Sequence, residues 1–367
     1  MGRNINRIEL PYPQSDNWMI RTQTSRFVKG RLRQSGRILP RLLLGCGVAT
    51  GFGVILIVGL AVWLFSGSGD LQSPHHPFRS ATAKERYLQL YDSIAAEWPV
   101  PSDTTTVSTS LGPTFVRISG PDSTPPLVLL HGAGGNSLQW RLNVAALSER
   151  HRTYAVDVIY DCGRSVYTRV PTGADDFTGW LNELLDVLEL GDDVSLVGLS
   201  YGGWLASQYA LRFPNRLDQL VLLAPAGTVL PLSFSWIRRA MLCVLPSRRF
   251  TSSFLYWLLP DLATRDEASR EFLEREIDAA YLAIRSYKLT RLVNPSVLTD
   301  SQLQSIRVPT LFLVGENEKI YPALSAIERL NRVAPQIETQ IIPHAGHDLT
   351  IVQTELVNRK IVQFLTR

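Results

Sequence analysis

The chain has 367 residues, of which 45% are hydrophobic and 19% are charged, and its formal net charge is +4 at pH 7. This composition excludes a low-complexity chain, and the length allows one large core with additional segments. The charge is unevenly placed, because residues 1–41 hold nine Lys or Arg against two acids, a net +7 that leaves −3 for the remainder. A basic segment of this kind can bind nucleic acid, but the residues that follow it argue against that partner.

Residues 42–65, LLLGCGVATGFGVILIVGLAVWLF, contain no charged side chain. At about 1.5 Å per residue, a helix of this length spans the roughly 30 Å hydrocarbon core of a bilayer. A cleaved signal peptide is the alternative, but its apolar region is usually shorter and so is its leader. Because basic flanks stay in the cytoplasm, we expect a single-pass cell-membrane protein. Its N-terminal segment 1–41 is then cytoplasmic, its body is extracytoplasmic, and no nucleic-acid partner is expected.

Residues 66–109 connect this span to the rest of the chain. Their first part, 66–80, is rich in Ser, Gly and Pro and is typical of a linker. Acids outnumber basic residues over 82–98, so we expect a helix there that packs on the folded body and does not lie on a membrane. That prediction depends on four large side chains at helical spacing, Tyr87, Tyr91, Ile94 and Trp98.

From about residue 110, short apolar runs alternate with helical patterns. Runs typical of strands occur at 113–119, 127–130, 153–159, 194–198, 217–225, 310–315 and 339–343, with helical patterns such as 176–190 and 203–213 between them. This alternation predicts an α/β domain over 110–367, with a mostly parallel central sheet and helices on both faces. Residues at about 228–307 contain helical patterns without a convincing strand, and they predict a cap inserted at the functional edge of the sheet.

The sequence VSLVGLSYGGW at 194–204 is typical of a strand, a sharp turn and a helix. Gly198 and Gly202 leave room for a strained turn that holds the Ser200 hydroxyl at the edge of the sheet. This is the G-x-S-x-G nucleophile elbow in the context that the motif requires. Ser200 is therefore the predicted nucleophile.

A serine hydroxyl needs a base to remove its proton, and that base is usually a histidine that follows the acid in chain order. His347 lies in PHAGHDL after the last strand, beyond a glycine that lets the loop reach across the sheet edge. We expect His347 to be the base and His344 to be a structural residue of the loop. The acid that orients the base is expected in LVGENEKIYP after the penultimate strand. Glu318 is preferred there, and Glu316 is interpreted as a turn or capping carboxylate.

The tetrahedral intermediate of an acyl transfer needs backbone donors for its oxyanion. The amide of Tyr201, directly after the nucleophile, is one predicted donor. HGAGGNS at 131–137 follows a strand and is predicted to supply the other through the amide of Ala133. His131 is expected to brace this loop through a hydrogen bond. Trp140 and Trp204 are expected in the core.

Taken together, HGAGG, GLSYGG, GENE and GHD resemble the motifs of serine hydrolases of the α/β-hydrolase superfamily, in the order of that family. The resemblance covers residues 110 to the end. It implies the α/β-hydrolase fold, with Ser200, Glu318 and His347 as catalytic triad and Ala133 and Tyr201 as oxyanion hole. Relatives often carry D-x-x-G-x-G-x-S after the third of these strands, whereas DVIYDCGRS at 157–165 is one residue longer and has Tyr160 near the usual glycine.

The leading functional hypothesis is a membrane-anchored serine hydrolase that cleaves a small-molecule carboxylic ester, with no cofactor and no metal ion. A serine peptidase resembling the proline iminopeptidases and a carbon–carbon hydrolase are the enzyme alternatives. A noncatalytic binding module tethered to the membrane on the same scaffold is the alternative from another class. Cap residues 250–260, FTSSFLYWLLP, are too apolar for a solvated surface. They are expected to pack the cap onto the body, to line an apolar acyl pocket, or to do both.

Cysteine usage says little about function. Cys46 lies in the predicted span, and Cys162 and Cys243 lie in the body. A disulfide between the last two is compatible with an extracytoplasmic location. Two unrelated buried thiols are the preferred interpretation.

Overall fold

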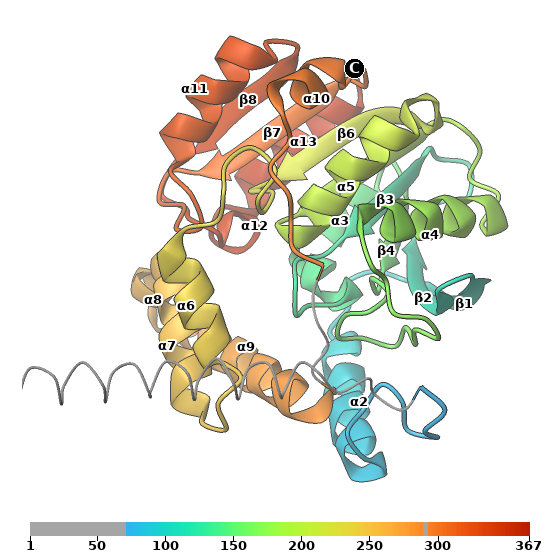
Figure 1. Cartoon of the computed structure of the whole chain (residues 1–367), viewed down its shortest axis with the longest axis vertical. Helices are drawn as coiled ribbons and strands as arrows, with labels where there is room; N and C mark the ends of the chain where they lie inside the picture. Colours follow the sequence, from blue (N-terminus) through green and yellow to red (C-terminus); the bar gives the residue numbers. More distant parts are fainter. Residues whose placement is uncertain (1–70, 289–292) are drawn as a thin grey trace, which may run out of the picture. The chain divides into compact units, whose positions relative to one another are not determined.

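The computed structural model describes residues 71–288 and 293–367 (Figure 1). The predicted cytoplasmic segment 1–41, the predicted membrane span 42–65 and residues 66–70 of the linker lie outside the described residues. No helix within the described ranges combines the length and the apolar character needed to cross a membrane.

Eight strands form one sheet in the order β1-β2-β4-β3-β5-β6-β7-β8. β2 pairs antiparallel with β1 and with β4, and all other neighbours pair parallel, so the expected mostly parallel sheet is confirmed. The strands are β1 (Asp103–Thr109), β2 (Gly112–Ser119), β3 (Pro126–Leu130), β4 (Arg152–Val156), β5 (Val194–Leu199), β6 (Leu217–Leu223), β7 (Thr310–Gly315) and β8 (Ile337–Ile342).

The central strands β5 and β7 are buried at every position because both faces of the sheet are covered. Alternate residues of a strand point to opposite faces, and in β3 the side chains of Val128 and Leu130 join one buried cluster while Leu127 and Leu129 join another. Helices cover these two clusters from opposite sides, and the sheet thus lies between two layers (Figure 1).

Residues of α4, α5, α10 and α11 fill the first cluster, and residues of α3, α12 and α13 fill the second. In α4, Phe177, Trp180, Leu181 and Leu184 are buried at the spacing of one helix face. These helices are α3 (Val144–Ser148), α4 (Ala174–Val187), α5 (Tyr201–Arg212), α10 (Asp300–Ser305), α11 (Ala323–Val333), α12 (Leu349–Val352) and α13 (Thr354–Leu365), with 3₁₀ turns at Ser137–Leu142 and Pro214–Arg216.

Four helices between β6 and β7 form the cap, which lies on one side of the sheet layers (Figure 1). They are α6 (Phe234–Leu242), α7 (Arg248–Leu258), α8 (Pro260–Arg265) and α9 (Glu267–Ser286). The predicted segment 228–307 also includes α10, which belongs to the sheet layers, because Arg329 of α11 donates to Asp300 at 2.7 Å and to the carbonyl of Leu298 at 2.8 Å.

The lead helix α2 (Ala81–Ala95) packs against cap helix α9 (Figure 1). Its inner face buries Tyr87 and Tyr91, two of the residues that predicted the helix. Tyr87 stacks edge-on against Tyr287 at the end of α9, with ring centroids 4.9 Å apart. The helix ends before Trp98, whose indole N–H instead donates to the Ser119 hydroxyl of β2 at 3.1 Å.

Candidate active site

Ser200 lies between the end of β5 and the start of α5, on a backbone with φ 53° and ψ −113°. This conformation favours glycine, so Ser200 occupies a strained turn. The turn also requires the glycines around it. A Cβ on Gly198 would lie 2.3 Å from the carbonyl oxygen of Gly202, and a Cβ on Gly202 would lie 2.2 Å from the carbonyl oxygen of Leu130.

Hydrogen bonds from the neighbouring strand hold this turn in place. The Ser200 N–H donates to the carbonyl of Leu223 at 2.9 Å, and the Ser200 carbonyl accepts from the N–H of Ala226 at 3.0 Å. Leu223 ends β6, the strand beside β5. Strand β6 and the loop that follows it therefore fix the backbone of Ser200 through its N–H and its carbonyl.

The structure brings the three predicted triad residues together from three loops. The Ser200 Oγ lies 3.0 Å from Nε2 of His347, and Nδ1 of the same ring lies 3.0 Å from Oε2 of Glu318. The other carboxylate oxygen of Glu318 accepts the backbone N–H groups of Lys319 at 2.8 Å and Ile320 at 3.0 Å. Since an ionised carboxylate can only accept, a neutral His347 carries its proton on Nδ1 and leaves Nε2 to accept from the serine hydroxyl.

The electrostatic surroundings of His347 favour its protonated form. Its side chain is 11% exposed, and that of Glu318 is fully buried. Burial alone would lower the pKa of His347, but the charge and hydrogen bond of Glu318, together with the charge of Asp348, raise it above 6.5. This arrangement stabilises the imidazolium that forms when the ring takes a proton from serine.

The loop after β3 lies against the nucleophile, since a Cβ on Gly132 would be 3.3 Å from the Cβ of Ser200. His131 braces this loop, as the sequence predicted. Its Nε2 accepts the N–H of Val158 at 2.9 Å, which leaves Nδ1 to donate to the Gly132 carbonyl at 2.8 Å. With both nitrogens engaged in these bonds, His131 is not available to Ser200.

Two further side chains hold the amides on either side of Ala133. The N–H of Gly132 donates to Gln139 Oε1 at 2.8 Å, and the N–H of Gly134 donates to both carboxylate oxygens of Asp161 at 3.0 and 3.1 Å. Sequence reasoning missed both residues. The longer loop at 157–165 was the available signal for Asp161, and no sequence signal distinguishes Gln139.

The loop at 157–165, which is one residue longer than the family pattern, has an unusual backbone conformation at Tyr160. Tyr160, near the usual glycine, has φ 70°, a value that glycine adopts without strain. Tyr160 is 6% exposed, and its ring packs edge-on against Tyr167 with centroids 4.7 Å apart. The buried carboxylate of Asp157 stabilises the loop by accepting the N–H groups of Ser137 and Arg164, each at 2.7 Å.

Glu316, the alternative acid, binds the backbone of His344, the other histidine of the last loop. Glu316 is exposed, and its Oε2 accepts the N–H of His344 at 3.1 Å. His344 itself is exposed and has φ 51°. Glu316 therefore acts on the loop backbone, as a turn carboxylate, and the hydrogen bond to Nδ1 of His347 comes from Glu318.

Other expectations for the body concern tryptophans and thiols. Trp140 and Trp204 are at most 1% exposed, which confirms their place in the core. Cys162 and Cys243 are free thiols. Burial raises the pKa of both thiols, to about 11 for Cys243, so neither is activated as a nucleophile.

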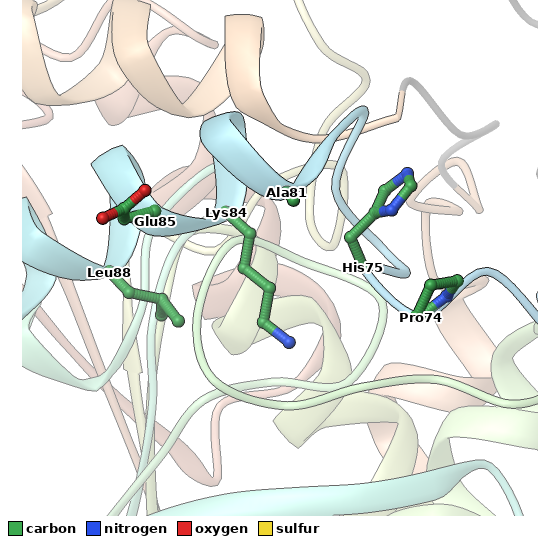
Figure 2. A pocket seen from close by; sticks show the side chains of 6 residues that line it. All are labelled: Pro74, His75, Ala81, Lys84, Glu85 and Leu88. Carbon is green, nitrogen blue, oxygen red and sulfur yellow. The ribbon is translucent and has the colours of Figure 1, made fainter.

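A surface hollow of about 320 Å³ lies at the N-terminal end of α2 (Figure 2). Its lining comes from α2 and the segment before it, namely Pro74, His75, Ala81, Lys84, Glu85 and Leu88. Ser200, Glu318 and His347 are not among the residues that line this hollow, so it is not part of the candidate active site.

Residues 127–359 match the sequence profile of the Alpha/beta hydrolase family. The chain belongs to this family. Within the alpha/beta hydrolase family it is 35% identical to "Uncharacterized carboxylesterase nap" of Bacillus subtilis (strain 168) over 282 residues, which are 76% of this chain and 92% of that protein. It is 34% identical to "Carboxylesterase YbfK" of the same strain over 291 residues, 78% of this chain and 96% of that protein.

A comparison with solved structures tests the fold. The crystal structure of naproxen esterase (carboxylesterase NP) from Bacillus subtilis superposes with a TM-score of 0.72 at 32% sequence identity, covering 78% of this chain and 99% of that chain. The fold expected from the motifs is therefore confirmed.

Proposed function

We propose that this protein is a membrane-anchored serine hydrolase that cleaves carboxylic esters through an acyl-enzyme on Ser200. The observation that carries the proposal is the hydrogen-bonded chain from Ser200 Oγ through His347 to Glu318, with 3.0 Å at each step. The carboxylesterase relatives support an ester as substrate.

In the acylation half of the reaction, Ser200 Oγ attacks the ester carbonyl carbon while Nε2 of His347 takes the hydroxyl proton. The carbonyl π electrons move to the oxygen. Glu318 accepts a hydrogen bond from Nδ1 and stabilises the imidazolium. When the tetrahedral intermediate collapses, the bond to the alkoxy oxygen breaks and His347 returns the proton to the leaving alcohol. In deacylation, water gives a proton to His347 as its oxygen attacks the acyl carbon. When the second tetrahedral intermediate collapses, the bond from the acyl carbon to Ser200 Oγ breaks, His347 returns the proton to Oγ, and the carboxylic acid leaves.

The negative oxygen of the intermediate requires donors beside Ser200. The amide of Tyr201 is the first of α5 and therefore has no acceptor within the helix. The amide of Ala133 lies on the loop that packs against Ser200, between two amides that are already held by Gln139 and Asp161. We assign the oxyanion hole to these two amides, and rigid placement of such donors is their main contribution to rate.

A membrane location is part of the proposal and is supported by the uncharged run at 42–65 and the +7 segment before it. A surface on the cap is compatible with it. In α6, Phe234, Ile237 and Met241 are 77%, 41% and 46% exposed at the spacing of one helix face. Arg238 and Arg249 of the same cap are exposed, whereas Arg248 pairs with Glu274 and Asp278 of α9. Exposed cations beside an apolar face suit anionic lipid headgroups. Such a location favours lipophilic esters as substrates.

The test of this function is covalent labelling of the full-length chain with a fluorophosphonate probe, combined with ester and peptide substrate panels. We expect the chain to be labelled and to hydrolyse esters, and we expect Ser200→Ala to lose both activities while keeping its fold. Loss of a triad nucleophile lowers kcat by about 10⁶-fold in a studied serine protease. Ser207→Ala, which removes a buried hydroxyl of the same helix that donates to the Trp204 carbonyl at 2.7 Å, is the matched control.

Other outcomes separate the alternatives. Labelling with preference for peptide substrates would favour the serine peptidase. Labelling without turnover of either panel would favour the carbon–carbon hydrolase. A folded wild-type chain that is neither labelled nor active would favour the noncatalytic binding module. Near-normal esterase activity in Ser200→Ala would contradict the assignment of the nucleophile.

A further inference from the structure

Cap helix α8 contacts the two loops that carry the predicted acid and base, and two hydrogen bonds cross between them in opposite directions. The side-chain amide of Asn317 in the body donates to Asp261 Oδ1 in α8 at 2.8 Å. The backbone N–H of Leu262 in α8 donates to Asp348 Oδ2 in the body at 2.8 Å. In sequence, Asn317 directly precedes the predicted acid and Asp348 directly follows the predicted base.

The carboxylate of Asp348 binds the loop backbone next to His347 and the backbone of α8. Asp348 is buried, with 1% of its surface exposed. Besides accepting from Leu262, it accepts the N–H of Gly346 through Oδ1 at 2.9 Å. The loop that presents the imidazole is thus tied to itself and to the cap through one buried carboxylate, and hydrogen bonds to a charged group are stronger than neutral ones.

Asp261 approaches the same loop from the cap. Its Oδ2 is buried and has no hydrogen-bond partner within the described residues. The same oxygen lies 3.4 Å from the position that a Cβ on Gly346 would take. Asp261 and Asp348 thus lie on opposite sides of one contact between α8 and the loop of His347.

We propose that Asp348 and Asp261 are positioning residues that fasten the loops of His347 and Glu318 to α8, so that the cap helps to set the geometry of the base. This inference rests on the proposed serine-hydrolase function and deepens it, because it gives the cap a part in catalysis besides any contact with substrate. Charge supports the same assignment. The charge of Asp348 contributes, with that of Glu318, to the raised pKa of His347.

The test is Asp348→Asn in the full-length chain, with kcat and KM measured on a p-nitrophenyl ester across a pH series. Asn can accept at only one of the two positions, so one backbone bond is lost. We expect kcat to fall about 10- to 100-fold with little change in KM, because a displacement of about 1 Å at a reacting group costs up to about 10²-fold. His347 must be neutral to act as base. Removal of the Asp348 charge lowers its pKa, so the acidic limb of kcat/KM should move to lower pH.

The charged groups that face His347 in this experiment are Glu318 from the loop after β7 and Asp348 from its own loop, with Asp261 of α8 next to the latter. The matched control is Asp176→Asn, which disturbs a carboxylate that accepts the Thr172 N–H at 2.7 Å outside this contact. It should leave kcat, KM and the acidic limb unchanged.

Each remaining outcome decides the question. A folded Asp348→Asn variant with wild-type kcat overturns the proposal. The proposal is also overturned if activity falls only in proportion to the amount of folded protein and the acidic limb of kcat/KM does not move. If Asp348→Asn does not fold, Asp261→Ala decides by the same kcat and KM measurements, and unchanged values overturn the proposal. A folded wild-type chain without ester hydrolysis or fluorophosphonate labelling overturns the proposed function itself, before any variant is compared.

Discussion

Ser200 holds a backbone conformation that serine adopts at a cost. A non-glycine residue in such a sparsely populated region loses about 1–3 kcal/mol, and the surrounding bonds to Leu223 and Ala226 maintain it. The benefit is the position of the hydroxyl, 3.0 Å from the imidazole of His347. At this residue, stability and activity therefore favour different amino acids.

Stability should accordingly rise when Ser200 is replaced by glycine. We expect the free energy of unfolding of Ser200→Gly to exceed that of Ser200→Ala by about 1 kcal/mol. The relief of strain exceeds the extra chain entropy of glycine, about 0.5–1 kcal/mol. Both variants lose activity, so thermal or urea unfolding of the two is the measurement. Equal stabilities would show that the turn carries no strain at this residue.

The choice between the two glutamates of the loop after β7 is also a prediction at the residue scale. Glu318→Gln should lower kcat by about 10³- to 10⁴-fold, because an amide no longer stabilises the imidazolium. Glu316→Gln should stay near wild type, since that side chain accepts from the His344 backbone and, among the described residues, has no bond to His347. Ester hydrolysis of the two variants is compared directly, and the reverse order would move the acid to Glu316.

At the scale of elements, helix α7 connects the cap to the neighbourhood of the site. Phe254 and Trp257 stack with ring centroids 6.4 Å apart, and both pack against the buried cluster that contains Ala226 and Ile320. Those two residues hydrogen-bond through their amides to Ser200 and Glu318. These side chains are partly buried, which suits both packing and contact with an acyl chain.

Chain-length preference measures which of these roles α7 has. We expect kcat/KM for p-nitrophenyl esters to rise from acetate to at least hexanoate, by about fourfold per methylene, since each buried methylene contributes about 0.8 kcal/mol. Trp257→Ala should flatten that rise. Tyr256→Ala is the matched control, because the Tyr256 hydroxyl donates to Glu274 of α9 at 2.7 Å and its ring packs against the other cluster. A preference for acetate that Trp257→Ala leaves unchanged would assign the cap aromatics to packing alone.

Elements with strong apolar patterns were predictable, and elements made by tertiary contacts were not. The run at 310–315 is the strand β7 as predicted, because all six of its residues are buried. The predicted strand at 153–159 ends at Val156, since the buried Asp157 turns the chain into the loop that it stabilises. Strand β1, DTTTVST, was missed because it buries only Val107 and therefore shows no apolar alternation.

The triad followed from motifs, because each of its residues lies directly after a strand or turn with a recognisable pattern. The bonds of α8 to these loops join residues 56 and 86 positions apart in the chain. No local pattern encodes a contact at such a separation, and only the folded structure shows which cap helix reaches the base.

For the molecule as a whole, the separation of charge along the chain leads to a prediction of topology. The +7 segment and uncharged span predict that the N-terminus lies in the cytoplasm and the hydrolase body outside it. Protease added to intact cells, with the outer envelope opened where one exists, should therefore digest the body. The control is an epitope placed before residue 41, which should be protected until lysis. Protection of the body under the same conditions would contradict this orientation.

The contacts of α8 have a consequence for protein engineering. The four cap helices form one uninterrupted stretch, Phe234 to Ser286, so a donor cap can be grafted between β6 and β7 with two junctions. Yet Asn317 and Asp348, the partners of α8, are encoded downstream of both junctions. A chimera that exchanges only the inserted stretch therefore combines the cap of one parent with the Asn317 and Asp348 positions of the other. Recombination between relatives should preserve turnover best when the crossover lies beyond Asp348, so that cap and loops come from one parent.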